Sequence, residues 1–172
     1  MISEKMQDAI NDQINAELYS GYLYLSMQAY FEGENLPGFA NWMSCQAQEE
    51  VAHAMKFFHY LGERGGRAVL KAIEGPETEW DSAQAAFEGA YAHEQLVTAR
   101  IHDLVKVARE EGDTATEIFL QWYVTEQVEE EAAADGIVQK VKMLAGAPGG
   151  LFLLDRELAQ RTFTPPAGEG EN

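Results

Sequence analysis

The chain has 172 residues, 46% of them hydrophobic, which suits one domain with a sizeable core and is too short for two ordinary domains. Its 29 acidic and 12 basic side chains give a formal net charge of −17, which disfavours nucleic acid and anionic membrane surfaces as partners and favours metal cations. The single cysteine excludes an internal disulfide, the longest uncharged stretch (residues 18–31) is shorter than the roughly 20 residues of a membrane helix, and no secretory signal is recognisable, so we expect a cytoplasmic protein.

Glycine and proline divide the first part of the chain into two long helical segments. The first helix is predicted over residues 3–32 and stops before Gly33. The second is predicted to open at Pro37 and to end near residues 62–66. Because only a short turn separates them, the two helices are expected to be antiparallel neighbours.

A second helical pair follows further along the chain. We expect Asp81 and Thr114 to cap the third and fourth helices, because each is followed three residues later by Gln or Glu. Only residues 111–113 separate these two helices. The fourth is predicted to end at the glycine-rich turn 146–150, and a short fifth helix to cover residues 151–160.

The connection between the pairs, residues 65–80, has no sustained apolar period. Fully extended, a segment of this length reaches roughly 50 Å, which is enough to run the height of a bundle of long helices. No strand-like alternation of any length is present. The sequence therefore predicts an all-α protein: a four-helix bundle with one long crossover and a short fifth C-terminal helix.

Each long helix carries an apolar stripe at three- and four-residue spacing, and each stripe has a glutamate near its middle. Glutamates of a solvated face would fall out of phase with the apolar residues, whereas these fall in phase. The four residues are Glu17, Glu50, Glu94 and Glu130.

Carboxylates converging on a bundle interior need a counter-charge, because an unpaired buried carboxylate costs several kcal/mol. None of the stripes carries Lys or Arg, so a buried cation is the economical partner. His53 lies three residues after Glu50 and can reach the same ion. Oxygen ligands with one imidazole suit iron or manganese better than zinc or calcium, and four carboxylates balance two divalent ions.

These residues resemble the ferritin-like di-iron proteins, and most closely the non-haem ferritins of prokaryotes. That family takes one Glu from each of two helices and Glu-x-x-His from each of the other two. Here Glu17, Glu94 and the segment 50–53 (Glu-Val-Ala-His) match this rule, and the fourth helix departs from it. The fourth helix offers Gln127-Val128-Glu129-Glu130 and no second histidine, which is similar to ferritins rather than bacterioferritins. The resemblance covers residues 1–163, which we expect to form one domain.

The resemblance implies a dinuclear iron site. The first ion would take Glu17, Glu50 and His53, and the second Glu50 as a bridge with Glu94, Glu130 and a nearby Gln127. A third iron position beside the pair would take Glu49, Glu126 and Glu129 and share Glu130.

Two aromatic residues also match positions beside the family's metal site. Tyr24 and Trp122 would each be able to supply an electron during oxidation. No haem is expected, because Val51 stands where the methionine ligand of bacterioferritins would lie.

The function implied is that of an iron-storage subunit that oxidises Fe²⁺ to Fe³⁺ with O₂ or H₂O₂ and stores ferric mineral inside a homo-oligomeric cage. Such a shell would have 24 subunits in octahedral symmetry, with the fifth helix at the four-fold axes. Two alternatives stay open: a di-iron peroxidase or oxygenase on the same bundle, and a metal-buffering cage without turnover. Rubrerythrin-type peroxidases add a four-cysteine domain that this chain lacks.

The remaining residues of interest have structural interpretations. Cys45 is expected to be a small buried side chain. Three histidines without matched partners are expected at the surface or in packing positions: His59, His93 and His102. The tail, residues 164–172, is expected to be disordered.

Overall fold

The computed structural model describes residues 1–144 and 146–165. Within these ranges the chain forms helices and no strand, which confirms the all-α prediction. The helices are α1 (Glu4–Gly33), α2 (Pro37–Glu63), α3 (Ala83–Glu110), α4 (Thr114–Leu144) and α5 (Gly150–Leu158). None of the described helices is apolar enough over a sufficient length to cross a membrane.

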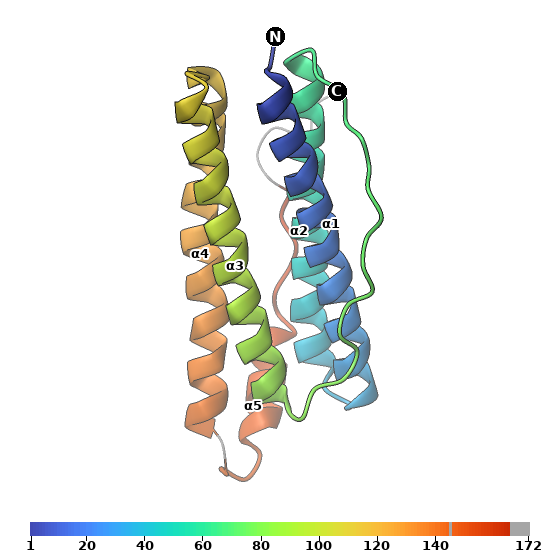
Figure 1. Ribbon diagram of the computed structural model, residues 1–172. Coiled ribbons are helices and arrows are strands. Elements are labelled where there is room, and N and C mark those ends of the chain that lie inside the picture. The colour runs from blue at the N-terminus through green and yellow to red at the C-terminus, as the bar shows by residue number, and fades with distance from the viewer. Residues whose placement is uncertain (145, 166–172) are drawn as a thin grey trace.

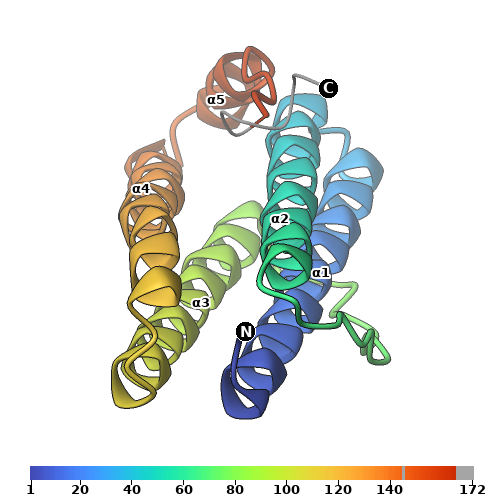
Figure 2. The ribbon, with the colours of Figure 1, turned by 90° about the horizontal axis from the view of Figure 1, so that it is seen from above.

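The four long helices pack as two antiparallel pairs, α1 with α2 and α3 with α4 (Figure 1). Each pair is joined by a short turn with one residue in the left-handed region: Asn35 has φ 58° and Gly112 has φ 65°. Seen from above, α5 lies at one end of the bundle, across from the N-terminus (Figure 2). The predicted bundle is confirmed.

The crossover between α2 and α3 runs along the outside of α1 for most of the bundle height (Figure 1). Side chains of α1 hold it by its main chain: Asn11 Nδ2 donates to the carbonyl of Arg67 at 3.1 Å, and Asn11 Oδ1 accepts from the amide of Val69 at 2.8 Å. Ser26 Oγ donates to the carbonyl of Glu77 at 2.6 Å. The segment is therefore fixed without secondary structure of its own.

Both predicted caps of the second helical pair are wrong by one residue. Ser82, not Asp81, caps α3, since its Oγ accepts from the amide of Ala85 at 3.1 Å. Asp113, not Thr114, caps α4, since its Oδ1 accepts from the amide of Thr116 at 3.1 Å. Two adjacent residues at each start are able to cap a helix, and the sequence pattern does not choose between them.

The helix α5 is held to the bundle by a buried aspartate. Asp155 Oδ1 accepts hydrogen bonds from the amides of Gly38 at 2.7 Å and Phe39 at 3.1 Å, in the first turn of α2. The residue before α2, Leu36, offers no capping side chain, so Asp155 supplies the cap from a distant helix. A Cβ on Gly38 would lie 1.7 Å from the carbonyl oxygen of Asp155, so only glycine allows this approach.

The apolar core is divided into two clusters, one toward each end of the bundle. Tyr24, Phe31, Phe39 and Phe87 belong to the cluster at the α5 end, and Ile10, Phe57, Leu61 and Leu120 belong to the other. Polar side chains that are almost completely buried lie on the same helices between them: Glu17, Glu50, His53, Glu94, Gln127 and Glu130. The middle of the bundle is therefore polar.

Candidate metal centre

All four long helices contribute to the polar middle of the bundle. The exposed fractions are 1% for Glu17 on α1, 2% for Glu50 and His53 on α2, 1% for Glu94 on α3 and 6% for Glu130 on α4. Each residue lies in phase with apolar neighbours on its helix, and so faces inward for the same reason as they do.

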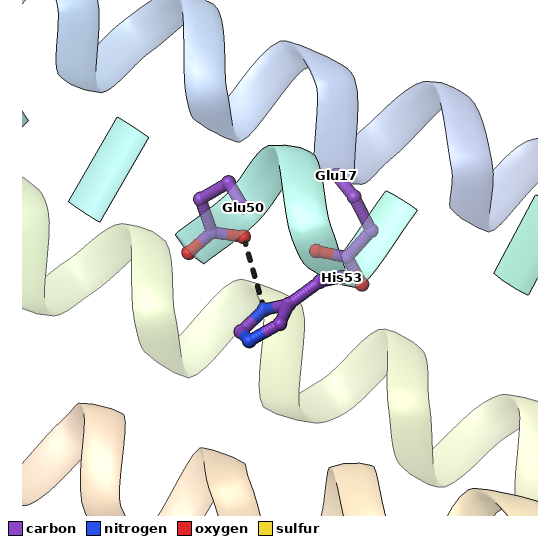
Figure 3. Close-up of side chains that lie close together, drawn as sticks. All are labelled: Glu17, Glu50 and His53. Carbon is purple, nitrogen blue, oxygen red and sulfur yellow. Dashed lines mark ion pairs between the residues drawn. The ribbon is translucent and has the colours of Figure 1, made fainter. Parts of the chain in front are cut away.

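A first cluster of possible metal ligands joins α1 and α2. One atom from each of Glu17, Glu50 and His53 lies within 4.8 Å of the others. Figure 3 shows the two carboxylates and the imidazole turned toward the same space, with His53 Nδ1 3.6 Å from Glu50 Oε2. This spacing suits three ligands of a single ion, and the set is the one expected for the first iron.

A second cluster joins α2 and α4. It consists of His53, Glu126 and Glu130, again with one ligand atom from each within 4.8 Å of the others. His53 Nε2 lies 4.0 Å from Glu126 Oε1, so the two imidazole nitrogens face different carboxylates. This grouping differs from the set expected for the second iron, in which Glu130 shares an ion with Glu50 and Glu94.

Glu94 and Glu130 are oriented by hydrogen bonds. The hydroxyl of Tyr24 donates to Glu94 Oε1, and Gln127 Nε2 donates to Glu94 Oε2 at 3.2 Å. Gln46 Nε2 donates to Glu130 Oε2 at 2.9 Å. These donors stabilise charged carboxylates and leave part of their oxygen lone pairs for another partner.

The electrostatics show that the carboxylates act on one another. Burial, followed by the charges of Glu94, Glu17 and Glu130, raises the pKa of Glu50 well above its usual value. Burial and Glu130 raise the pKa of Glu94 to about 8, against the opposing hydrogen bonds of Tyr24 and Gln127. Burial and the charge of Glu94 likewise raise the pKa of the Tyr24 hydroxyl.

A bound cation would neutralise the repulsion between these carboxylates. Glu17 Oε2 is buried and accepts no hydrogen bond from the described residues, although Gln13 Nε2 donates to its other oxygen at 2.8 Å. Buried acceptors without donors are rare in folded proteins unless an ion or water serves them. A hard metal ion fits the unsatisfied oxygen, the imidazole and the excess of carboxylates together.

The residues expected at the third position are less buried and more dispersed. Glu126 belongs to the second cluster, Glu129 is exposed on α4, and neither geometric cluster includes Glu49 or Glu129. Glu49 pairs instead with Arg161, whose Nη2 lies 2.6 Å from its Oε2. Burial raises the pKa of Glu49 to about 7, with Arg161 opposing the rise and Glu130 and Glu126 adding to it.

Aromatic rings line the centre on two sides. Trp122 packs edge-on against His53 at 5.4 Å between ring centroids, and Tyr123 donates a hydrogen bond to the His53 carbonyl at 2.8 Å. Tyr24 contacts Trp42 and His93 edge-on at 6.5 and 6.1 Å. Both aromatic residues singled out in the sequence, Tyr24 and Trp122, therefore adjoin predicted ligands.

Several residues around the centre were not predicted to have a role. Gln13 lies one helical turn before Glu17 and donates to it, and Gln46 lies one turn before Glu50 and donates to Glu130. Their position on the same helix face as the glutamates was the sequence signal that could have identified them. His93 is partly buried in a packing position, as expected, and its ring also contacts Ser20 Oγ at 2.8 Å. Burial lowers its pKa to about 4. Cys45 is buried, as expected.

A bundle with carboxylates from four helices and Glu-x-x-His on one of them defines the class of carboxylate metal-binding four-helix proteins. Comparison with known proteins names the family. Residues 7–144 match the family model described as ferritin-like domain. The chain belongs to the ferritin family and, within it, to the prokaryotic non-haem ferritins.

Relatives cover nearly the whole chain. A bacterial non-heme ferritin of Bacteroides fragilis is 48% identical over 161 residues, which span 94% of this chain and all of that protein. One from Staphylococcus aureus is 36% identical over 95% of this chain and 98% of that protein. An engineered closed form of the Archaeoglobus fulgidus ferritin is 57% identical, with a TM-score of 0.94 over 95% of this chain and all of that chain.

A second similar structure is also of the archaeal protein. It is described as a novel open-pore ferritin, is 57% identical, and matches with a TM-score of 0.93 over 94% of this chain and all of that chain. Together with the five-helix fold, these similarities confirm the predicted family. They do not assign single residues to single ions, which stays a prediction.

Proposed function

We propose that this chain is an iron-storage subunit that oxidises ferrous iron at the centre of its bundle. The observation that supports it is the set of four mutually repelling carboxylates, buried together with His53 between two apolar clusters. Two Fe²⁺ ions would enter this centre as substrate. Each would lose one electron, and the two electrons with two protons would reduce O₂ to H₂O₂, or H₂O₂ to water.

In this proposal the protein binds and positions, while the redox chemistry belongs to iron. Glu17, Glu50 and His53 hold the first ion, and Glu50, Glu94 and Glu130 hold the second, with Gln127 keeping Glu94 in place. The cluster of His53, Glu126 and Glu130 supports a further position toward α4, where Glu49 and Glu129 would complete a third site.

Tyr24 and Trp122 are proposed as local electron donors. The Tyr24 hydroxyl already donates to Glu94, so its proton has an acceptor if the ring is oxidised. Trp122 packs on the imidazole of His53. No haem is part of the proposal, and half-exposed Val51 stands at the position of the missing haem ligand.

Storage requires a closed shell, because one bundle encloses no mineral cavity. We infer that residues 1–163 act as one domain, that 24 copies of the 19.1 kDa chain form the shell in the cytoplasm, and that neither nucleic acid nor membrane takes part. The net charge of −17 supports attraction of Fe²⁺ to its channels and inner wall. Octahedral packing around α5 is the expected arrangement, and the archaeal relative described as an open-pore ferritin indicates a second arrangement that native mass spectrometry and electron microscopy of this protein would distinguish.

The first experiment replaces Glu50 by Gln, which keeps the shape of the side chain and removes its charge. Stopped-flow absorbance after aerobic addition of Fe²⁺ should show ferric product forming at least about 100-fold more slowly, because both ions lose their shared ligand. The matched control is Glu63→Gln, at an exposed position of the same helix, which should oxidise iron at the parental rate.

The outcomes separate the alternatives. A Glu50→Gln variant as fast as the parent would overturn the assignment of the site. Binding of Fe²⁺ by the parent without oxidation by O₂ or H₂O₂ would identify a metal-buffering cage. Oxidant consumption by a monomeric species in native mass spectrometry would favour the peroxidase or oxygenase alternative.

A further inference from the structure

The segment after α5 returns along α2 and is fastened to it by its main chain. The carbonyls of Leu158 and Arg161 accept hydrogen bonds from Asn41 Nδ2 at 3.1 and 3.0 Å. Cys45 Sγ contacts the Arg161 carbonyl at 3.8 Å. The Cα of Arg161 is thus held against the face of α2 that carries Glu49.

The side chain of Arg161 is equally well fixed. Its guanidinium lies over the Trp42 ring at 4.5 Å, Nη1 donates to the Trp42 carbonyl at 3.4 Å and Nη2 donates to Glu49 Oε2 at 2.6 Å. The two paired side chains are only 23% and 17% exposed. A pair that is shielded from water and stacked on an aromatic ring is stronger than an ordinary surface ion pair.

The carboxylate that Arg161 occupies is the one that the proposed third metal position would use. Glu49 feels the negative charges of both Glu126 and Glu130, two residues of the cluster with His53. A guanidinium and a metal ion placed on the same carboxylate share its lone pairs and repel each other. Both cannot bind Glu49 at full strength.

We propose that Arg161 is a tethered cation that competes with the third metal ion for Glu49, so that this ion binds after the dinuclear pair and leaves before it. The inference rests on the proposed function, since it presumes metal at the bundle centre. The hydrogen bonds that hold the main chain of residues 158 and 161 to α2 keep the guanidinium close to Glu49 at a high effective concentration. An arriving ion has to displace it. Arg161 is a positioning residue for metal entry, not a ligand.

The arrangement connects this site to the end of the bundle. Arg161 follows α5 by three residues, and α5 is docked on α2 through Asp155. Any change of α5 that shifts the returning segment would also move the guanidinium from Glu49.

The test measures metal binding to the assembled, metal-free protein in the absence of oxidant. Co²⁺ is titrated by calorimetry and by visible absorption. The parent should show two strong sites and one weak site for each subunit. Arg161→Gln should tighten the weak site about tenfold and leave the strong pair unchanged, because only the competitor at Glu49 is lost.

Three variants serve as controls. Arg156→Gln removes the same charge from an exposed position on α5 and should leave all affinities unchanged. Arg161→Lys keeps the charge without the planar fork and should tighten the weak site by less than Arg161→Gln, which gives a second reading if the latter fails to assemble. Glu49→Gln should remove the weak site from the parent and from Arg161→Gln alike.

An unchanged or weakened third site in Arg161→Gln would overturn the proposal. The same effect in Arg156→Gln would also overturn it, because the cause would then be general charge rather than competition for Glu49. Loss of the strong pair from the parent would instead contradict the proposed function, so the two failures are distinguishable.

Discussion

The pKa of Glu94 is set by opposing interactions at the centre of the bundle. Burial and the charge of Glu130 raise its pKa from 4.5 to about 8, although Tyr24 and Gln127 donate to it. Between these two values the folded chain holds a proton that the unfolded chain has released. The contribution of Glu94 to the free energy of unfolding of the metal-free protein therefore falls as the pH rises from about 4.5 to about 8.

This dependence is measurable by thermal unfolding of the metal-free protein between pH 5 and pH 8. The midpoint should fall with rising pH, and Glu94→Gln should make the slope shallower because the titrating group is gone. Glu63→Gln, at an exposed position of α2, should keep the parental slope. An equally steep slope in Glu94→Gln would contradict the assignment. Added divalent metal should reverse the trend, since metal displaces protons from its ligands.

At the scale of the element, the polar and apolar periods predicted most of what the structure contains. In-phase apolar residues gave four long helices, and the in-phase glutamates lie inside, because both follow from the same helical period. The caps at Ser82 and Asp113 were missed because neighbouring residues had equal capping ability. Arg161 was missed because its partner Glu49 is 112 positions away, and no period connects them.

The docking of α5 depends on one carboxylate. Asp155→Ala should lower the free energy of unfolding by about 1–2 kcal/mol, because it removes the acceptor of two amides at the start of α2. Urea unfolding followed by circular dichroism measures this change. The control is Glu157→Gln, which removes only an exposed pair with Lys140 and should cost less than about 0.5 kcal/mol. Equal losses in the two variants would argue against the capping role.

At the scale of the whole molecule, one face of the α1–α2 pair is too apolar for a solitary subunit. Large side chains there are between 36% and 50% exposed: Tyr22, Leu25, Val51, Met55 and Phe58. Contiguous apolar surface of this kind marks contact with another protein. It agrees with a subunit that completes its burial in a shell.

Met55→Glu should therefore shift the assembly toward smaller species, because a charge would be buried at the contact. Size-exclusion chromatography with light scattering measures the distribution. Met55→Leu keeps the apolar surface and should assemble as the parent does. Intact shells in Met55→Glu would show that this face is not the contact.

Repelling carboxylates separate the two apolar clusters of the core. The stability of the subunit should therefore depend on whether metal is bound between them. On the proposed function, cations bound between the clusters would stabilise the folded chain by mass action, because the unfolded chain does not assemble the site. Without metal the middle of the bundle should open more often, so its amide hydrogens should exchange faster than in the metal-loaded protein, and proteases act on opened chains. If metal binds there, the metal-free subunit should be cleaved by an added protease faster than the metal-loaded one.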